Sequence, residues 1–405
     1  MDILHIINEK GGSTMDFYRK ALEIRDKITA HRRFFHKNAE IGLEMPIACG
    51  YILQKLDEYG IKGEKCGHGI TAVIGKGGPV ILLRADMDAL PMKEESGEKF
   101  ACENGAAHTC GHDLHAAMLL GAAEMLAENA DRLKGRVKLM FQPAEETLQG
   151  CRDMLENGVL EAPAAEAALA FHVAAGKIPV GTVLYNSGGV MMSSADSFRI
   201  EVKGKGGHGA YPHLTIDPIG ICNKIYSAFE TAAAKETAPE RVCTITVGSF
   251  HGGDAPNIIP DFAAMEGMVR TDDRQLQIKL VKRIADLAEA YAKVYGGTAK
   301  VTFYKGVPPL VCDKKLTDEF AGYLQEDGFS QLDLREGIKA SASEDFALIA
   351  EKLPSAFMYL SAGFEDERGE FTAHNPKVRF NEDVLPVGAA CLAHCAVRWL
   401  EKRGQ

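Results

Sequence analysis

The chain has 405 residues, of which 46% are apolar and 25% are charged, and its formal net charge is −10 at pH 7. This length exceeds what a single hydrophobic core normally supports, so two domains are expected. The composition is that of an ordinary globular protein, and the lack of a basic block argues against nucleic acid or an anionic membrane as the main partner.

The N-terminus contains one short apolar stretch, residues 3–7, which is flanked by Asp2 and Glu9. It is too short for a membrane span and does not have the layout of an export signal. Ten cysteines are scattered along the chain without a Cys-x-x-Cys pair. We therefore expect reduced thiols in a cytoplasmic protein, rather than disulfides or a structural zinc site.

Strand-like and helix-like segments alternate in the first half of the chain. Residues 113–130 are rich in Ala, Leu and Met and predict a helix, with Asp113 as its N-terminal cap. Three short apolar runs predict buried strands. These runs are residues 80–85, 137–141 and 167–171.

Polar side chains follow each of these strands. Asp86 ends the first, Glu145 and Glu146 come shortly after the second, and His172 follows the third. Open α/β sheets bind their ligands at the carboxyl ends of the strands. The sequence therefore predicts a site at that edge of the sheet.

The pattern changes from about residue 193. Strands are expected at residues 197–205, 241–250, 261–271 and 300–305, and helices at 217–235 and 275–295. The order βαββαβ predicts a ferredoxin-like inserted domain. Its outer strands would have free edges, which favours pairing into a homodimer.

The helix–strand alternation returns after about residue 311. Helices are expected near residues 316–326 and 343–352, and a strand at 356–360 leads toward His374.

The segment from His108 to Asp113 has the composition of a metal site. A lone cysteine is usually a small buried hydrophobe, and the other nine cysteines are interpreted in that way. Cys110 differs because His108, His112, Asp113 and His115 surround it in the sequence. Thiolate and imidazole suit Zn²⁺ or a neighbouring first-row metal. His115 lies one helical turn beyond His112, so packing or a supporting role is expected for it.

The other candidate ligands each have a simpler alternative. His172 could be a hydrogen-bonded core histidine, and His374 lies in a turn. Two adjacent glutamates are usually solvated, but Glu145 and Glu146 follow a buried strand and a proline. In a metal hydrolase, one carboxylate can bind metal while its neighbour acts as the base. Together these groups exceed what one tetrahedral ion needs, so we predict a two-metal hydrolytic centre.

Motifs along nearly the whole chain resemble the M20 family of metallopeptidases and amidohydrolases. The similarity is to the subfamily of N-acyl-amino-acid amidohydrolases, hippurate hydrolases and auxin-conjugate hydrolases. The motifs are Arg84-Ala-Asp-Met-Asp-Ala-Leu-Pro91, His108-Thr-Cys-Gly-His-Asp113, Gln142-Pro-Ala-Glu-Glu146, Phe171-His172, Gly206-Gly-His-Gly-Ala210, Asn257-Ile-Ile-Pro260, Ser343-Glu-Asp-Phe346 and His374-Asn-Pro376.

The resemblance implies an α/β catalytic domain, with a central sheet flanked by helices, formed by residues 1–190 and 307–405. A ferredoxin-like α+β dimerisation (lid) domain, residues 191–306, would interrupt it. The implied assembly is a homodimer or a higher oligomer.

The resemblance also implies roles for individual residues. Glu145 would be the general base, and His208 would donate a hydrogen bond to the scissile carbonyl across the dimer. Asn257 and Arg270 would bind the carbonyl or carboxylate of the substrate, with a surface salt bridge as the alternative for Arg270. The implied ligands of two divalent ions are Cys110, His112, Glu146, His172 and His374.

One position departs from the wider family. Many relatives have a metal-binding His-x-Asp where this chain has Asp86-Met87-Asp88. Asp86 is therefore left out of the ligand set and is expected to support the ligands from behind.

These features predict a metal-dependent amidohydrolase that cleaves N-acyl-L-amino acids or similar small conjugates with metal-activated water. Zn²⁺ is expected, with Mn²⁺, Co²⁺ or Ni²⁺ as alternatives. The competing hypotheses are a metallo-dipeptidase of the same family, a non-catalytic binding or sensing protein on this fold, and a cysteine hydrolase that uses Cys110.

Overall fold

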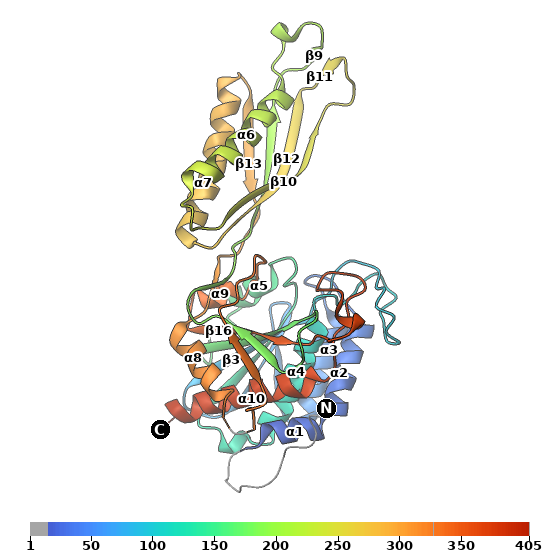
Figure 1. Ribbon diagram of the computed structural model, residues 1–405, viewed down its shortest axis with the longest axis vertical. Helices are drawn as coiled ribbons and strands as arrows, with labels where there is room; N and C mark the ends of the chain where they lie inside the picture. Colours follow the sequence, from blue (N-terminus) through green and yellow to red (C-terminus); the bar gives the residue numbers. More distant parts are fainter. Residues whose placement is uncertain (1–14, 327, 405) are drawn as a thin grey trace.

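The computed structural model describes residues 15–326 and 328–404, so the apolar stretch at residues 3–7 lies outside the described residues. Figure 1 shows a large helix-covered sheet in the lower part and a smaller sheet with two helices above it. The chain enters the smaller part once and leaves it once.

The large sheet has eight strands in the order β1-β2-β4-β3-β5-β16-β6-β15. Its centre is parallel, because β3 pairs in parallel with β4 and β5, and β5 pairs in parallel with β16. Strand β16 comes from the last part of the chain yet lies inside the sheet. The strands are β1 Gly63–Cys66, β2 Gly69–Gly75, β3 Val80–Asp86, β4 Arg136–Gln142, β5 Ala167–Ala174, β6 Thr182–Tyr185, β15 Asp333–Glu336 and β16 Ser355–Ser361.

Helices cover both faces of this sheet, which explains why its central strands are buried along almost their whole length. In β3, Ile81 and Leu83 contribute to one core, and Leu82 contributes to the other. The first core contains helices α1 Phe17–Glu23, α2 Arg25–Lys37, α3 Pro46–Glu58, α4 His112–Ala127, α8 Lys314–Tyr323 and α10 Val384–Arg403. The second core contains α5 Gly150–Glu156 and α9 Ala347–Ala350.

Helix α10 is long and apolar enough, by length and composition, to cross a membrane. However, 83% of its apolar window is buried inside the protein. It packs against α4 and α1 and contributes Trp399 to the core. A core helix accounts for this composition.

The predicted cap of helix α4 is wrong. Gly111, not Asp113, is the N-cap residue, and its φ of 93° is in the left-handed region that favours glycine. A Cβ at Gly111 would lie 2.4 Å from Val173 Cγ2. The Asp113 carboxylate instead accepts one hydrogen bond from Arg32 and pairs with His36, both on α2. Helix α2 thus holds the start of α4.

Two further boundaries differ from the sequence prediction. Strand β5 continues through His172, because its ladder with β16 extends to Ala174. The helix expected at residues 343–352 is reduced to α9, Ala347–Ala350, so Glu344 and Asp345 lie in the preceding turn.

The smaller sheet confirms the predicted order βαββαβ. Its antiparallel strands run β10-β12-β8-β13, and helices α6 Pro218–Glu236 and α7 Arg274–Val294 share its core. The strands are β8 Asp196–Lys203, β10 Cys243–Gly252, β12 Phe262–Thr271 and β13 Thr298–Phe303. Strands β10 and β13 each have one edge unpaired within the described residues. Domain boundaries at residues 191 and 306 stay a prediction.

Two short strand pairs complete the structure. Strand β7 Val190–Met192 pairs with β14 Leu310–Val311, just before and just after the smaller part. Strand β9 Gly207–His208 pairs with β11 Ile258–Ile259 at the tip of the smaller part, at the top of Figure 1.

Candidate metal centre

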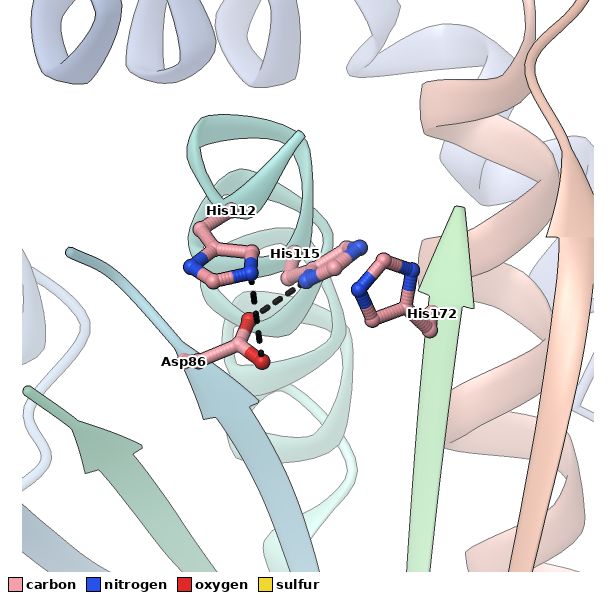
Figure 2. A group of neighbouring side chains, drawn as sticks. All are labelled: Asp86, His112, His115 and His172. Atoms are coloured by element: carbon pink, nitrogen blue, oxygen red, sulfur yellow. Dashed lines mark hydrogen bonds and ion pairs between the residues drawn. The ribbon is translucent and has the colours of Figure 1, made fainter. Parts of the chain in front are cut away.

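The carboxyl ends of β3, β4 and β5 meet at one edge of the large sheet. Figure 2 shows Asp86 at the end of β3, His112 and His115 on α4, and His172 on β5, with their side chains directed toward one another. The loop after β4 brings Glu145 and Glu146 to the same edge. The parallel pairing of these strands therefore explains why residues distant in sequence converge.

All five predicted metal ligands come together here. The ligand atoms of Cys110, His112 and Glu146 lie within 4.8 Å of one another. Cys110 Sγ is 3.5 Å from His172 Nε2, and His374 Nε2 is 3.4 Å from Glu146 Oε1. His112 Nε2 is 3.9 Å from the same Glu146 oxygen.

Two atoms of this cluster are buried without a hydrogen-bond partner among the described residues. They are His112 Nε2 and Glu146 Oε1. An unsatisfied buried polar atom costs about 1–3 kcal/mol, so a native site normally provides a partner. The set of thiolate, imidazole and carboxylate groups fits divalent first-row metals.

In two candidate ligands, His112 and His172, the Nδ1 ring nitrogen has a hydrogen-bond partner outside the ligand set. His112 Nδ1 lies 3.3 Å from Asp88 Oδ1, and His172 Nδ1 lies 2.8 Å from the carbonyl oxygen of Val173. These partners place the proton on Nδ1 and leave Nε2 directed into the cluster. Such fixed second nitrogens are typical of metal-binding histidines.

Asp86 and His115 also lie in the cluster, but their polar atoms have other partners. Asp86 Oδ2 accepts a hydrogen bond of 2.7 Å from Arg84, and Oδ1 pairs with His115 Nδ1. His115 Nε2 accepts a hydrogen bond of 2.8 Å from the Val173 backbone N–H. This arrangement favours support of the ligands, rather than metal binding, for both residues.

Asp88 has a role that sequence reasoning did not assign. Its Oδ1 accepts the backbone N–H of Glu145 at 3.0 Å, and its Oδ2 accepts that of Glu146 at 3.1 Å. The same carboxylate orients His112. The available signal was a second acid two residues after Asp86, on the same side of an extended segment.

Two other acids lie beside Glu145. Its carboxylate lies within 4.8 Å of those of Glu344 and Asp345. Burial raises the pKa of Glu145 well above its ordinary value, and Glu344 and Asp345 raise it further. Burial also raises the pKa of Asp345 to about 8, although Arg84 acts in the opposite direction. This environment favours the protonated form of Glu145.

The surroundings of Cys110 distinguish a ligand from a nucleophile. A thiol 3.5 Å from an imidazole could indicate a cysteine hydrolase. However, burial raises the pKa of Cys110 to about 12. A catalytic cysteine needs a lowered pKa, whereas a bound metal ion deprotonates its thiol ligand directly. The environment therefore favours a metal ligand.

His374 forms the exposed side of the cluster. Its side chain is 55% exposed, whereas that of Glu146 is 11% exposed. The backbone N–H of His374 donates to the carbonyl of Thr109, and its φ of 67° is unusual for a residue with a side chain. Substrate access is therefore expected from this side.

Two predicted substrate-binding residues lie away from the cluster. His208 and Asn257 are exposed at the tip of the smaller part, at the opposite end of the molecule from α4 (Figure 1). His208 Nδ1 accepts a hydrogen bond from Ala210 N–H. Arg270 ends β12 and donates to Ser343 Oγ at 2.6 Å. One chain alone does not bring His208 or Asn257 to the ligands.

A model of Peptidase family M20/M25/M40 matches residues 82–398 of the chain. The chain belongs to this family. The matched region includes all five candidate ligands and Glu145, so the cluster lies in the part of the chain that the family shares.

Curated M20 relatives cover nearly the whole chain. An IAA-amino acid hydrolase (ILR1-like 2) of Arabidopsis thaliana is 37% identical and spans 95% of this chain and 88% of its own length. Thermostable carboxypeptidase 2 of Saccharolobus solfataricus is 35% identical over 94% of this chain and 97% of its own. N-acetyl-L-cysteine deacetylase of Bacillus subtilis is 34% identical over 91% and 87%.

Solved structures agree with this assignment. A Bacillus subtilis protein described as a dinuclear metal binding peptidase from the M20 family has a TM-score of 0.78 and 29% identity, over 94% of this chain and 99% of that one. This M20 chain is therefore a metal-dependent hydrolase, and its ligand cluster and that neighbour together indicate two metal ions.

Replacing the thiol tests its assignment as a ligand. We expect Cys110→Ala to lower metal content as well as turnover, because a thiolate ligand is removed. Elemental analysis after reconstitution measures the metal. Cys49→Ala is the control, since Cys49 is also buried but contacts the carbonyl of His68. Full metal content with lost activity would instead support a nucleophile.

Proposed function

We propose that this M20 protein is an amidohydrolase that removes the acyl group from N-acyl-L-amino acids or similar small conjugates. The observation that supports it most strongly is the five-donor cluster, with Glu145, whose pKa is raised by burial, next to Glu146 in the chain. The relatives named as hydrolases of IAA-amino acids and of N-acetyl-L-cysteine favour this substrate class.

We infer that Cys110, His112, Glu146, His172 and His374 hold two divalent ions, with Zn²⁺ preferred because of the thiolate and Mn²⁺, Co²⁺ or Ni²⁺ as alternatives. Such ions polarise a carbonyl and make water more acidic. Asp86, linked to His115, supports this ligand set.

Glu145 acts as the general base in this proposal. Its carboxylate takes a proton from the attacking water and returns it to the departing amine. The raised pKa suits this task, because a more basic carboxylate accepts a proton more readily near neutral pH. Asp88 accepts hydrogen bonds from the backbone N–H groups of Glu145 and Glu146. It thereby fixes the backbone from which one side chain serves as the base and the other as a ligand.

The proposed catalytic assembly is a homodimer or a higher oligomer, with residues 191–306 as the dimerisation domain and residues 1–190 and 307–405 as the catalytic domain. The unpaired edges of β10 and β13 offer pairing surfaces. His208 is exposed and distant from its own metal centre, so it would complete the site of the partner by donating to the scissile carbonyl. Asn257 accompanies it, because its carbonyl accepts Gly209 N–H.

Arg270 is the proposed anchor for the substrate carboxylate. Within the described residues its guanidinium has only serine partners and forms no ion pair, and burial lowers its pKa. The predicted alternative, a surface salt bridge, is therefore absent from this part of the chain. A half-buried cation without an anionic partner is suited to bind a carboxylate.

A substrate panel tests the function. Metal-reconstituted protein should hydrolyse N-acetyl or N-benzoyl amino acids faster than dipeptides, and a chelator should abolish the activity. Preference for dipeptides with a free α-amine would support the peptidase alternative, which the carboxypeptidase relative favours. Absence of turnover on all of them would support a non-catalytic binding protein.

Arg270→Lys tests the carboxylate anchor. Lysine keeps the charge but loses the planar fork, so kcat/KM for N-acyl amino acids should fall about 10-fold or more. Arg199→Lys, at a surface ion pair with Glu266, is the control. Equal wild-type rates on N-acyl amino acids and on their carboxamides would contradict the anchor.

The proposed location is the cytoplasm. All ten cysteines are free in the structure, and nine of them pack as buried or partly buried side chains away from the ligand set. This arrangement is consistent with a reducing compartment.

A further inference from the structure

The loop that holds both glutamates has an unusual backbone. Residues 143–149 connect β4 to α5. Two non-glycine residues in this loop have positive φ, Ala144 at 50° and Leu148 at 56°. Such conformations cost about 1–3 kcal/mol each and persist only where surrounding contacts impose them.

The loop also closes tightly on itself. Leu148 N–H donates to the carbonyl of Glu145, and the N–H groups of Gln149 and Gly150 both donate to that of Ala144. A Cβ at Gly150 would lie 1.6 Å from the carbonyl oxygen of Pro143. Small changes at the ends of this loop therefore move Glu145 and Glu146.

Both ends of the loop are bonded to one carboxylate from the last part of the chain. Asp345 Oδ1 accepts Gln142 Nε2–H at 2.7 Å, immediately before the loop. Asp345 Oδ2 accepts Cys151 backbone N–H at 3.0 Å, immediately after it. Asp345 is fully buried, so water does not compete for these bonds.

Arg84 fixes the carboxylate itself. The buried guanidinium donates to Asp345 at 3.1 Å, and to Glu344 from both terminal nitrogens, at 2.8 and 3.3 Å. Its Nε–H donates to Gln142 Oε1 at 2.9 Å, and Nη1 also donates to Asp86. Five contacts match the five N–H groups of arginine. Arg84 thus links Asp345 to Asp86, the residue that supports the metal ligands.

We propose that Asp345 is a positioning residue of the hydrolytic site, which clamps the strained loop 143–149 at both ends and thereby places Glu145 and Glu146. The inference rests on the proposed role of Glu145. Asp345 touches neither substrate nor ligand in this proposal; it acts through Gln142 and Cys151.

Asp345→Asn tests the clamp with little change of shape. An amide cannot accept bonds at both of its ends, so one end of the loop is released. We expect kcat to fall about 10- to 100-fold at saturating metal, with KM changed less than about twofold, since small displacements of catalytic groups have effects of this size. Amide hydrogen exchange should become faster in residues 143–151 and stay unchanged in β3 and β5.

The matched control is Asp153→Asn on helix α5, which also carries Cys151. Asp153 accepts His68 N–H at 2.7 Å and also pairs with the His68 ring. The Asp153 side chain therefore binds the turn at His68 rather than the loop that carries the glutamates. Its replacement should leave kcat and exchange in residues 143–151 at wild-type values. Unchanged exchange in that segment of Asp345→Asn would overturn the proposal, even if activity fell.

A second variant approaches the clamp from its other side. Gln142→Met removes the bond to Asp345 while keeping similar volume, and should show the same pattern to a smaller extent. Unfolding of both variants, seen by circular dichroism, would make the cluster a determinant of stability and overturn the positioning role. The hydrogen-exchange measurement reports on the loop whether or not Glu145 is the general base. It can therefore support the clamp even if the proposed function fails, and contradict the clamp even if the proposed function holds.

Discussion

Glu145→Gln is expected to retain its metal and lose at least about 100-fold in turnover, the range in which removal of a general base typically falls. The amide keeps the shape of the side chain but cannot accept the proton. Because burial and the neighbouring Glu344 and Asp345 disfavour the charged form of Glu145, a neutral amide suits this position in the metal-free protein. The melting temperature of the metal-free protein should therefore stay the same or rise.

The measurement combines elemental analysis, steady-state kinetics and thermal unfolding of one preparation. Glu156→Gln is a suitable control, because Glu156 ends α5 near the loop and forms an exposed pair with Lys305. Near-normal turnover in Glu145→Gln would remove Glu145 from the base role. Loss of metal would instead make it a ligand.

Two inactive variants should regain activity when they share a dimer. His208→Ala lacks the tip imidazole, and Glu145→Gln lacks the base. If His208 serves the partner's site, a heterodimer has one site with both defects and one with neither. Its activity should approach half that of the wild-type dimer.

Differently tagged subunits allow the heterodimer to be purified and subunit exchange to be verified by mass spectrometry. The control pairs Glu145→Gln with Glu145→Gln, which must stay inactive after exchange. A purified heterodimer without activity would mean that His208 acts within its own chain or not in the reaction. The exposed position of His208, far from its own ligands, favours recovery.

The sequence predicted those features that depend on local patterns. Residues 80–85 and 137–141 form strands because short, mainly apolar runs are buried on both faces of the sheet, and polar residues then gather at their ends. The order βαββαβ followed from alternation and helical periodicity. The identities of the candidate ligands followed from residue chemistry and from the resemblance, and the structure places all five together.

The contacts behind the ligands could not be predicted in this way. Asp88 and Asp345 work by accepting N–H groups that are 57 to 203 positions away in sequence, and no local pattern encodes such approaches. Asp113 looked like a cap because its residue type suits one, but Arg32 and His36 bind its carboxylate instead. Tertiary contacts outweighed the local preference.

The position of β16 between β5 and β6 has a consequence for the order of synthesis. The ribosome releases the chain from its N-terminus, so β5 emerges long before the strand that covers its edge. Until residues 355–361 arrive, β5 exposes an unpaired apolar edge of the type that promotes wrong association. Asp345 and His374 arrive equally late. The metal centre therefore cannot be assembled until His374 has emerged from the ribosome.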